Sequence, residues 1–433
     1  MSDNTGHRSR AAAARLLGRI LDRGQMLDQA LADELEAGGR LAALEPRDRA
    51  FARLLTMTVL RRLGQIDDAI TRCLDKPLNR AAKPALNALR LAAAQAMFLG
   101  TPAHAIADGA VRLMGPRRRH LNGLVNAVAR RLIREAPGIL ADQDAAALNC
   151  PKWLWQAWTK TYGAETTKTM VETMLSEPPL DLTFKNESEP WLEALQGEML
   201  PTGSMRRMAG GAIQTLPGFS EGEWWVQDAA AALPVALLGK ELEGRAVLDL
   251  CAAPGGKTAQ LAALGAQVTA VDNEPNRMTL VQANLERLNL QAETVVADIL
   301  TWRPEKPFDF ILLDAPCSAT GTIRRHPDIW HLRSAKVPKE MALVQDGMLA
   351  AAVEMLAPGG TIVFCTCSLQ PEEGEDRIEA LLASGKSVSR WPITADELFG
   401  LEELITPLGD MRTLPHYLGG MDGFYACRLV RDA

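Results

Sequence analysis

The chain has 433 residues, of which 47% are hydrophobic, so it is long enough for two or three domains with substantial cores. Its seven cysteines, an odd number without a CxxC pair, argue against a disulfide framework or a zinc site and for a reducing compartment. No apolar run reaches membrane-spanning length, and the first residues lack the apolar stretch of a secretory signal. We therefore expect a cytoplasmic protein that needs neither a membrane nor a metal.

The net charge of −6 hides a strong separation of charge along the chain. Residues 1–140 hold 23 Lys and Arg against 13 Asp and Glu, a balance of +10, which leaves −16 for the remainder. A separate basic segment is typical of a module that binds a polyanion, because phosphate contacts release counterions and give affinity without sequence preference. A solvated, arginine-rich helical surface is the alternative that charge alone leaves open.

The first part of the chain has a helical pattern throughout, from residue 8 to about residue 135. Apolar residues recur at spacings of three and four among Ala, Leu and Arg, which favour helices, in the segments 11–21, 47–63, 85–99 and 120–133. The pattern predicts an all-helical bundle over residues 1–140, with the basic run Arg117-Arg-Arg-His120 opening its final helix. Residues 135–150 are predicted to be a linker.

Residues 141–220 are predicted to hold the end of this linker and a small α/β subdomain. Two aromatic-bearing helical stretches come first, followed by a strand-like segment at 180–184 and a helix near 190–195. Trp153, Trp155 and Trp158 suit base stacking in RNA recognition, but aromatics at helical spacing are more typical of a core.

Residues 221–433 alternate between strands, loops and helices. Short, almost continuously apolar runs, as expected for strands that are covered on both faces, occur at 247–250, 268–271, 293–297, 310–313 and 361–364. Helical stretches separate most of them, notably 276–288 and 339–356. The alternation predicts a Rossmann-like, doubly wound α/β domain, whose ligand lies at the C-terminal ends of the strands.

The first of these strands leads into a glycine-rich loop, Cys251-Ala-Ala-Pro-Gly-Gly-Lys-Thr258, just before a helix. Glycine lets backbone pass close to a ligand, and the start of a helix offers free N–H groups. A Walker loop would need glycine in place of Cys251, and the G-x-G-x-x-G fingerprint of dinucleotide sites is absent. An S-adenosylmethionine pocket is the interpretation that remains.

Acidic residues end the strands that follow. Asp272 ends the second strand, at about the distance after the glycine-rich loop where a carboxylate accepts hydrogen bonds from both ribose hydroxyls. Asp298 ends the third strand and is suitably placed to reach the adenine. A single aspartate at a strand end is usually a turn or helix cap. Three in succession, with Asp314 ending the fourth strand, favour cofactor ligands.

Two cysteines lie in the loops after the fourth and fifth strands. These loops read Asp314-Ala-Pro-Cys317-Ser-Ala-Thr-Gly321 and Cys365-Thr-Cys367-Ser-Leu-Gln-Pro-Glu-Glu373, and the acidic pair after Pro371 looks like a helix start. A free cysteine is commonly an inert apolar residue, but Cys317 and Cys367 lie where the ligand is expected. Thiols beside a nucleotide-like cofactor suit methylation of cytosine C5, which becomes enamine-like when a thiolate adds to C6.

Further motifs extend this pattern over the C-terminal half. In order, the half contains Val226-Gln-Asp228-Ala, Asp249-Leu-Cys-Ala-Ala-Pro-Gly-Gly-Lys-Thr258, Asp314-Ala-Pro-Cys-Ser, His326-Pro-Asp-Ile329, Thr366-Cys-Ser-Leu-Gln-Pro-Glu-Glu373, and Arg412-Thr-Leu-Pro-His416 with Asp422-Gly-Phe424. Together they resemble the Sun (RsmB-type) branch of the bacterial RNA 5-methylcytosine methyltransferases. Residues 1–140 are similar, in pattern and length, to the NusB-type RNA-binding bundle of this branch.

The resemblance implies an enzyme that methylates C5 of a cytosine in RNA with S-adenosylmethionine, with 16S rRNA, naked or in an assembling particle, as the substrate. It implies that Cys367 is the nucleophile and that Cys317 assists product release. Asp314, as a neutral acid, is expected to hydrogen-bond cytosine N3. The implied cofactor pocket consists of Cys251, Ala252, Ala253, Pro254, Gly255, Gly256, Lys257, Asp272, Asp298 and Asp314.

Several alternatives stay open at this point. DNA cytosine methyltransferases use the Pro-Cys after strand four, and this chain has both cysteines, so reversed roles of Cys317 and Cys367 are not excluded. A tRNA cytosine-C5 methyltransferase, a non-catalytic RNA-binding ribosome-assembly factor and a protein or small-molecule methyltransferase are the competing functions.

The chain departs from the family's usual motifs at three positions. Cys365 stands where Ser is usual, Ala319 where Gly is usual, and Gly374 where Asn often follows the Glu pair. None of the three replaces a group with a chemical role in the reaction.

Overall fold

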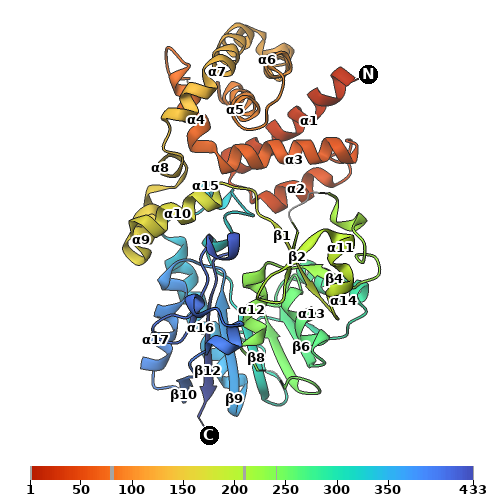
Figure 1. Ribbon diagram of the computed structural model, residues 1–433, viewed down its shortest axis with the longest axis vertical. Coiled ribbons are helices and arrows are strands. Elements are labelled where there is room, and N and C mark those ends of the chain that lie inside the picture. Colours follow the sequence, from red (N-terminus) through yellow and green to blue (C-terminus); the bar gives the residue numbers. More distant parts are fainter. Residues whose placement is uncertain (1, 79–81, 208–210, 240, 433) are drawn as a thin grey trace. The chain divides into compact units, whose positions relative to one another are not determined.

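The structure is a computed structural model that describes residues 2–78, 82–207, 211–239 and 241–432, and its chain forms two compact units (Figure 1). A helical unit comprises Met1–Ser176 and Ile323–Ser334, and a sheet unit comprises Glu177–Thr322 and Ala335–Ala433. The helical unit thus includes residues 141–176 as well as a short segment far along the chain that returns to it.

The helical unit consists of helices with polar outer faces and apolar inner faces, as the sequence pattern predicts. Their bounds are α1 Ser2–Leu17, α2 Leu27–Leu35, α3 Pro46–Arg61, α4 Leu63–Arg72, α5 Lys83–Met97, α6 Ala103–Arg112, α7 Asn122–Asp142, α8 Ala145–Asn149, α9 Lys152–Tyr162, α10 Ala164–Met174 and α15 Ile329–Leu332. Within the described residues, none of the helices of the chain combines the length and the apolar character needed to cross a membrane.

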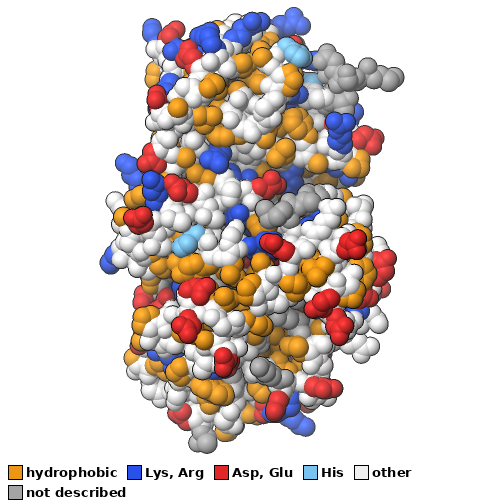
Figure 2. Space-filling model, viewed as in Figure 1, with side chains coloured by type: hydrophobic (Ala, Val, Ile, Leu, Met, Phe, Trp, Pro, Cys, Tyr) orange, Lys and Arg blue, Asp and Glu red, His pale blue; other side chains and the backbone are white. Residues whose placement is uncertain are grey.

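Basic side chains are concentrated on the surface of this unit. Arg117, Arg118 and Arg119 are exposed in a 3₁₀ turn, Pro116–Leu121, which leads directly into α7. Figure 2 shows Lys and Arg side chains gathered over the end of the unit where α6 and α7 lie. The charge that the sequence assigns to residues 1–140 therefore lies in part on exposed backbone turns and helix ends.

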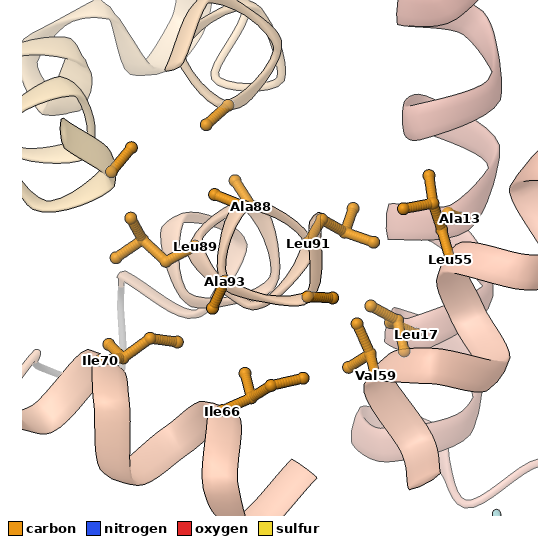
Figure 3. Close-up of a cluster of buried hydrophobic side chains, with 14 of the residues drawn as sticks. Ala13, Leu17, Leu55, Val59, Ile66, Ile70, Ala88, Leu89, Leu91 and Ala93 are labelled. Carbon is orange, nitrogen blue, oxygen red and sulfur yellow. The ribbon is translucent and has the colours of Figure 1, made fainter. Parts of the chain in front are cut away.

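The core of the helical unit surrounds α5. Figure 3 shows Leu91 and Ala93 of α5 facing apolar side chains of neighbouring helices, among them Leu17 of α1, Val59 of α3 and Ile66 of α4. All five of these side chains are fully buried. Each fully buried large aliphatic side chain stabilises the fold by roughly 1.5–3 kcal/mol, and the small alanines let the helices approach closely.

The prediction of a linker at residues 135–150 is wrong, because most of this stretch is helical. Helix α7 continues through Pro137 to Asp142, and α8 follows after two residues. Proline weakens a helix by removing one hydrogen bond, but buried Ala136 and Ile139 on either side anchor this turn of α7 in the core. Helices α9 and α10, expected in the small subdomain, belong to the helical unit.

The returning segment Ile323–Ser334 is held in the helical unit by polar and aromatic contacts. The fully buried carboxylate of Asp328 accepts the backbone N–H of Leu27 at 2.9 Å, and His331 Nε2 lies 2.8 Å from the carbonyl oxygen of Leu60. Trp330 packs edge-on against Trp158, with ring centroids 6.0 Å apart. Trp158 is fully buried and is therefore a core residue, whereas Trp153 and Trp155 are half-buried.

The sheet unit contains a large mixed sheet of order β10-β12-β9-β8-β5-β6-β7, with β11 on the free part of β12. Strands β7, β6, β5, β8 and β9 are parallel, and β12 runs antiparallel between β9 and β10. The bounds are β5 Ala246–Leu250, β6 Gln267–Asp272, β7 Glu293–Val296, β8 Phe308–Asp314, β9 Leu356–Thr366, β10 Val388–Arg390, β11 Met411–Arg412 and β12 Tyr425–Arg431. The five predicted strands are confirmed as β5 to β9.

Helices cover both faces of this sheet, as the continuous apolar runs predict. Val247, Leu312 and Val363 pack on one face with residues of α12, whereas Leu248 and Ile311 pack on the other with residues of α16 and α17. Neighbouring strand residues thus alternate between two cores. The helices are α12 Ala229–Ala236, α13 Gly256–Ala263, α14 Pro275–Leu288, α16 Val337–Met355 and α17 Glu375–Ala383. The predicted doubly wound α/β fold class is confirmed.

A second, antiparallel sheet of order β2-β3-β1-β4 precedes the large one. Its strand β1 is Leu180–Phe184, as predicted, and α11 Leu192–Leu195 matches the predicted helix. The strands β2 Gly197–Met199, β3 Met205–Arg207 and β4 Trp224–Val226 have three residues each, too few to produce a period in the sequence.

A buried ion pair joins β1 and β3 of this sheet. Two guanidinium nitrogens of Arg206 lie 2.7 Å from the two carboxylate oxygens of Asp181, and both side chains are almost fully buried. The Asp181 carboxylate also accepts the N–H of Ala229 at 3.2 Å, at the start of α12. The pair therefore links the small sheet to the first helix of the large one.

We predict that Arg206→Ala lowers the free energy of unfolding by about 3–5 kcal/mol, because it leaves the Asp181 carboxylate buried and unpaired. The control is Asp309→Asn, which breaks the exposed pair Arg245–Asp309 and should cost less than about 1 kcal/mol. Chemical denaturation measures both variants, and equal losses would contradict the prediction.

Candidate active site

Parallel strands bring the predicted site residues to one edge of the large sheet. In the paired register Leu250 lies beside Val271 and Leu313, and Asp314 lies beside Cys365. The loops that follow β5, β6, β8 and β9 therefore start side by side. These loops contain the glycine-rich motif, Cys317 and Cys367, and Asp272 is the last residue of β6.

The glycine-rich loop folds tightly from β5 into α13. Cys251 and Gly255 both have positive φ, 62° and 98°, and the N–H of Ala252 donates to the carbonyl of Val271 at 3.1 Å. A side chain at position 255 would place its Cβ 3.2 Å from the backbone of Val281. Glycine is thus required there both by the backbone angle and by the close approach of α14.

Asp249, on β5, is a buried carboxyl that was not among the predicted cofactor residues. It is fully buried, and its Oδ2 accepts the hydroxyl of Thr258 at 2.6 Å. Burial raises its pKa to about 7, although the Thr258 hydrogen bond and the positive charge of Lys257 act in the opposite direction. Its Oδ1 has no hydrogen-bond partner among the described residues.

Lys257 and Asp314 form an ion pair at this edge, with Nζ and Oδ2 2.7 Å apart. Burial would lower the pKa of Lys257, but the charge of Asp314 outweighs it and raises that pKa above its ordinary value. The ammonium also lies 4.9 Å from the centre of the Phe424 ring, and the thiol of Cys365 contacts Asp314 Oδ1 at 3.5 Å. Lys257 is therefore a charged ammonium group, which donates a hydrogen bond to the Asp314 carboxylate.

Asp272 and Asp298 make local hydrogen bonds in this structure. Asp272 is almost fully buried and accepts the N–H groups of Ala253 at 3.2 Å and Glu274 at 3.1 Å, so it ties the end of β6 to the glycine-rich loop. Asp298 is exposed and accepts the N–H of Leu300 at 2.9 Å. Carboxylate oxygens accept more than one hydrogen bond, so these contacts leave room for a ligand.

The two predicted catalytic cysteines meet at this edge, with their Sγ atoms 3.4 Å apart. The contact with Cys367 and burial raise the pKa of the Cys317 thiol well above its ordinary value, and the charges of Cys367 and Glu373 add to this effect. The described residues contain no cluster of three His, Cys, Asp or Glu side chains suited to a metal ion.

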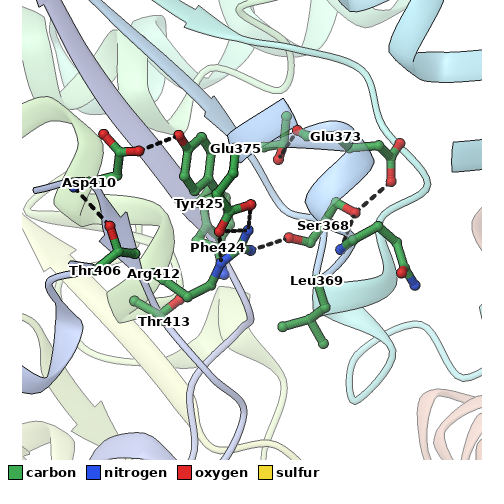
Figure 4. Close-up of polar contacts among 12 residues, drawn as sticks. Ser368, Leu369, Glu373, Glu375, Thr406, Asp410, Arg412, Thr413, Phe424 and Tyr425 are labelled. Atoms are coloured by element: carbon green, nitrogen blue, oxygen red, sulfur yellow. Dashed lines mark hydrogen bonds and ion pairs between the residues drawn. The ribbon is translucent and has the colours of Figure 1, made fainter. Parts of the chain in front are cut away.

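Glu373, which the sequence pattern places in the exposed first turn of a helix, is fully buried instead. It lies in a 3₁₀ turn, Pro371–Glu373, and accepts the Ser368 hydroxyl at 2.5 Å (Figure 4) and the Ser318 N–H at 2.7 Å. In the sequence, this contact corresponds to a spacing of five residues between Ser368 and Glu373. The spacing predicts a contact only when the turn between the two residues is known.

Arg412 holds the same loop from another direction (Figure 4). Its guanidinium donates to the backbone carbonyl of Ser368 at 2.6 Å and to both carboxylate oxygens of Glu375, and it lies 4.9 Å from the centre of the Tyr425 ring. The Tyr425 hydroxyl in turn donates to Asp410 at 2.6 Å. The motif that begins at Arg412 is therefore a support for the loop that carries Cys367.

Close backbone packing explains two further motif residues. A Cβ on Gly321 would lie 1.9 Å from the carbonyl oxygen of Gly423, and the N–H of Gly423 donates to the Gly321 carbonyl at 3.0 Å. The N–H of Gly321 donates to the Cys367 carbonyl at 2.9 Å. Gly321 and Gly423 are thus needed for the loops to meet.

Ala319, where the family usually has Gly, has a positive φ of 59°. This left-handed conformation costs an alanine roughly 1–2 kcal/mol, so the usual glycine has a physical reason. At Gly374, where Asn is often found, a Cβ would lie 2.9 Å from the Tyr425 ring. The neighbouring side chains would have to move to admit one.

A Rossmann-like sheet, a glycine-rich loop at its ligand-binding edge and two adjoining thiols define a methyltransferase of the class that the sequence predicts. The family described as 16S rRNA methyltransferase RsmB/F matches residues 236–430, and the NusB family matches residues 7–134. The chain belongs to this RsmB/F family of ribosomal RNA methyltransferases. The predicted family, fold class and enzyme class are confirmed.

Curated relatives share this organisation over their whole length. The ribosomal RNA small subunit methyltransferase B of Vibrio vulnificus is 34% identical over 98% of this chain and 99% of its own. The protein of the same name from Serratia proteamaculans is 35% identical over the full length of both chains. The solved protein PH0851 has the same fold, with a TM-score of 0.74 and 22% identity over 98% of each chain.

We predict that the Asp249 carboxyl makes stability depend on pH. Its folded pKa of about 7 lies above the ordinary value of about 4, so the stabilisation from its protonated form is complete below about pH 4 and is lost as pH rises to about 7. Relative to Asp249→Asn, the wild type should lose at most about 1.4 kcal/mol per pH unit in this window.

Urea unfolding between pH 4 and pH 8 measures this difference. The exposed Asp309→Asn variant is the control and should keep a constant offset from the wild type. A constant offset for Asp249→Asn as well would contradict the prediction.

Proposed function

We propose that this protein transfers a methyl group from S-adenosylmethionine to C5 of a cytosine in 16S rRNA, with Cys367 as the nucleophile. The observation that carries the proposal is the contact of two thiols, 3.4 Å apart, at the ends of two neighbouring parallel strands. The ion pair between buried Lys257 and half-buried Asp314 adjoins them, as does a glycine-rich loop. Curated relatives along the full length are named for methylation of small-subunit ribosomal RNA.

The residues at the strand ends fit S-adenosylmethionine. The loop at Gly255 leaves no space for a side chain, and the first N–H groups of α13 suit a carboxylate. Asp272 and Asp298 offer acceptors for ribose and adenine, and the unpartnered Oδ1 of Asp249 is a further polar atom at this edge. When bound, S-adenosylmethionine supplies a methyl group on sulfonium to a nucleophilic carbon.

Cys367 starts the reaction on the RNA base. Its thiolate adds to C6 of the cytosine, and the electron pair that moves onto C5 takes up the methyl group. Loss of the proton from C5 then drives β-elimination, which breaks the bond between sulfur and C6 and returns the thiolate. The base must leave any helix to reach the sulfur, so a structured rRNA loop is a better target than an intact duplex.

Lys257 and Asp314 bind the pyrimidine ring in this scheme. We expected a neutral Asp314 to hydrogen-bond N3, but in the free protein Lys257 donates to this carboxyl at 2.7 Å. A bound cytosine therefore lies against an ion pair in which the Lys257 ammonium is the hydrogen-bond donor. Hydrogen bonds from this ammonium stabilise the negative charge that develops on the ring when the thiolate adds.

Cys317 suits the release step better than the attack. The family that the motifs resemble places its nucleophile after the fifth strand, which corresponds to Cys367 in this chain. At 3.4 Å from Cys367 it is close enough to assist the elimination that frees the product. The reversed assignment, known from DNA cytosine methyltransferases, is the alternative that variants of the two cysteines test.

The helical unit is the proposed RNA-binding module. The exposed turn with Arg117, Arg118 and Arg119 lies in the segment that matches the NusB family. Phosphate contacts by such residues give affinity that depends on salt but not on sequence. We propose that the enzyme acts on 16S rRNA rather than tRNA, because curated relatives are named ribosomal RNA small subunit methyltransferase B. We also propose that it works in the cytoplasm, since seven cysteines without a CxxC pair suit a reducing compartment.

We predict opposite effects of the two cysteine variants. Cys367→Ala should lower methyl transfer by about 10⁴-fold or more, because the attacking atom is lost. Cys317→Ala should instead accumulate a covalent complex of protein and RNA, because release is blocked. Labelled S-adenosylmethionine with 16S rRNA measures transfer, and a denaturing gel measures the complex.

The control is Cys427→Ala, a buried cysteine of β12 that faces neither of these thiols. If Cys367→Ala stayed active and Cys317→Ala formed no complex, the assignment would be wrong. No transfer of label to either 16S rRNA or tRNA by the wild type would favour a non-catalytic assembly factor. Label that resists ribonuclease would favour a protein or small-molecule methyltransferase.

We predict that the triple variant Arg117→Gln, Arg118→Gln, Arg119→Gln binds rRNA more weakly and with a smaller salt dependence. The logarithmic salt slope should fall by about 0.7 for each lost phosphate contact to a single strand. Affinity for S-adenosylmethionine should not change. Filter binding at several salt concentrations measures this, and Arg245→Gln in the sheet unit is the matched control.

A further inference from the structure

Glu373 is a buried carboxylate beside the two thiols, and the proposed reaction does not use it. Its side chain is fully buried, and burial raises its pKa although the hydroxyls of Ser318 and Ser368 oppose this. A buried carboxylate costs several kcal/mol in lost hydration unless its hydrogen bonds compensate. A glutamate in the first turn of a helix would avoid this cost by facing solvent, so its burial needs another reason.

The carboxylate connects the two catalytic loops. Each cysteine is followed directly by a serine, and Glu373 contacts both of these serines. It accepts the N–H of Ser318 at 2.7 Å, the hydroxyl of Ser318, and the hydroxyl of Ser368 at 2.5 Å. Figure 4 shows the side chains of Ser368 and Glu373 pointing toward one another across this contact. One side chain thus fixes the residue after each thiol.

Weaker contacts join the same loops. The two serine hydroxyls are 3.3 Å apart, and the hydroxyl of Thr320 accepts the N–H of Leu369 at 3.0 Å. These contacts are between neutral groups, whereas those to Glu373 involve a carboxylate and are about twice as strong. Glu373 is therefore the main side-chain link between the loops.

We propose that Glu373 is a positioning residue that keeps Cys317 within reach of Cys367 while Cys367 is bonded to the base. This inference rests on the proposed function. When Cys367 binds C6, its sulfur is displaced toward the substrate, and Cys317 has to follow for the elimination to proceed. A carboxylate that holds both loops moves them together. Its charge also helps to keep the Cys317 thiol protonated until that step.

The first test compares turnover and the covalent complex in Glu373→Gln and Glu373→Ala. A thiol misplaced by about 1 Å costs on the order of 10²-fold in rate, so Glu373→Ala should lower multiple turnover by at least about 10-fold. The share of enzyme trapped as a complex with RNA should rise, because formation of the complex depends on Cys367 and its release on both loops. Affinity for S-adenosylmethionine should stay within about twofold of the wild type, because Glu373 does not touch the glycine-rich loop.

Glu373→Gln is the conservative variant. Its amide oxygen accepts the Ser318 N–H but not all three donors, so its turnover should lie between those of the wild type and Glu373→Ala. The neighbouring Glu372→Gln is the matched control and should turn over like the wild type, since Glu372 is partly exposed in the same turn. Glu373 variants that turn over and release RNA like Glu372→Gln would overturn the proposal.

A second test needs neither RNA nor methyl donor. In glutathione buffers, the ease with which Cys317 and Cys367 form a disulfide reports how well the loops hold the two thiols together, and peptide mass spectrometry identifies the pair. The effective concentration of one thiol at the other should fall by about 10-fold or more in Glu373→Ala and less in Glu373→Gln. An unchanged value would contradict the positioning role.

The two tests separate the failure of this proposal from the failure of the proposed function. If the wild type transfers no methyl group to RNA, the proposed function fails, while the disulfide measurement still decides whether Glu373 holds the thiols together. If Glu373→Ala does not fold, Glu373→Gln and the double variant Ser318→Ala, Ser368→Ala take its place. Both remove contacts of the same carboxylate and leave its volume filled.

Discussion

The parallel pairing of β8 with β9 is the constraint on which the site depends. Because Asp314 lies beside Cys365, both strands end at the same height, and their loops begin within hydrogen-bond distance of each other. The N–H of Ala315 donates to the Cys365 carbonyl at 2.9 Å, which extends this pairing into the loops. A shift of the register by one residue would turn Asp314 away from Lys257 and separate the cysteines. The chemistry is thus fixed first by backbone geometry and only then by side chains.

Buried charge is concentrated around this edge of the sheet. Asp249, Lys257 and Glu373 are buried there, and each needs a specific partner to remain there. The partner of Lys257 is the half-buried Asp314. Such an arrangement does not favour stability, since well-packed apolar residues would fill the same volume at lower cost. The apolar cores on the two faces of the sheet and in the helical unit stabilise the fold and offset the free-energy cost of these charges.

Much of the fold could be predicted because its strands and helices carry long periodic patterns. The parallel strands appear in the sequence as continuous apolar runs. Residues such as Gly255 and Asp272 could be predicted because the ligand of this fold binds at the C-terminal ends of the strands. The strands β2, β3 and β4 could not be found, since three residues show no period. Helix α7 was cut short in the prediction because Pro137 is normally a breaker, and only tertiary packing overrides it.

The positions of the catalytic cysteines could be predicted, but not the side chains that hold them. Cys317 and Cys367 belong to recognisable strand-end motifs. Glu373 has the sequence context of an exposed helix start, and its burial depends on a turn that brings it back to Ser368. Arg412 is far along the chain from the carbonyl that it binds. Contacts between residues far apart in the sequence leave no periodic signal.

The segment Ile323–Ser334 has a consequence for how the chain is made. Trp158 and the N–H of Leu27 find their partners, Trp330 and Asp328, only after more than three hundred residues have been synthesised. The helical unit, although first to leave the ribosome, therefore completes its interior only after Glu177–Thr322 of the sheet unit have been made. Until then an apolar surface around Trp158 stays open to water or to a chaperone. The helical unit therefore does not finish folding before part of the sheet unit has been synthesised.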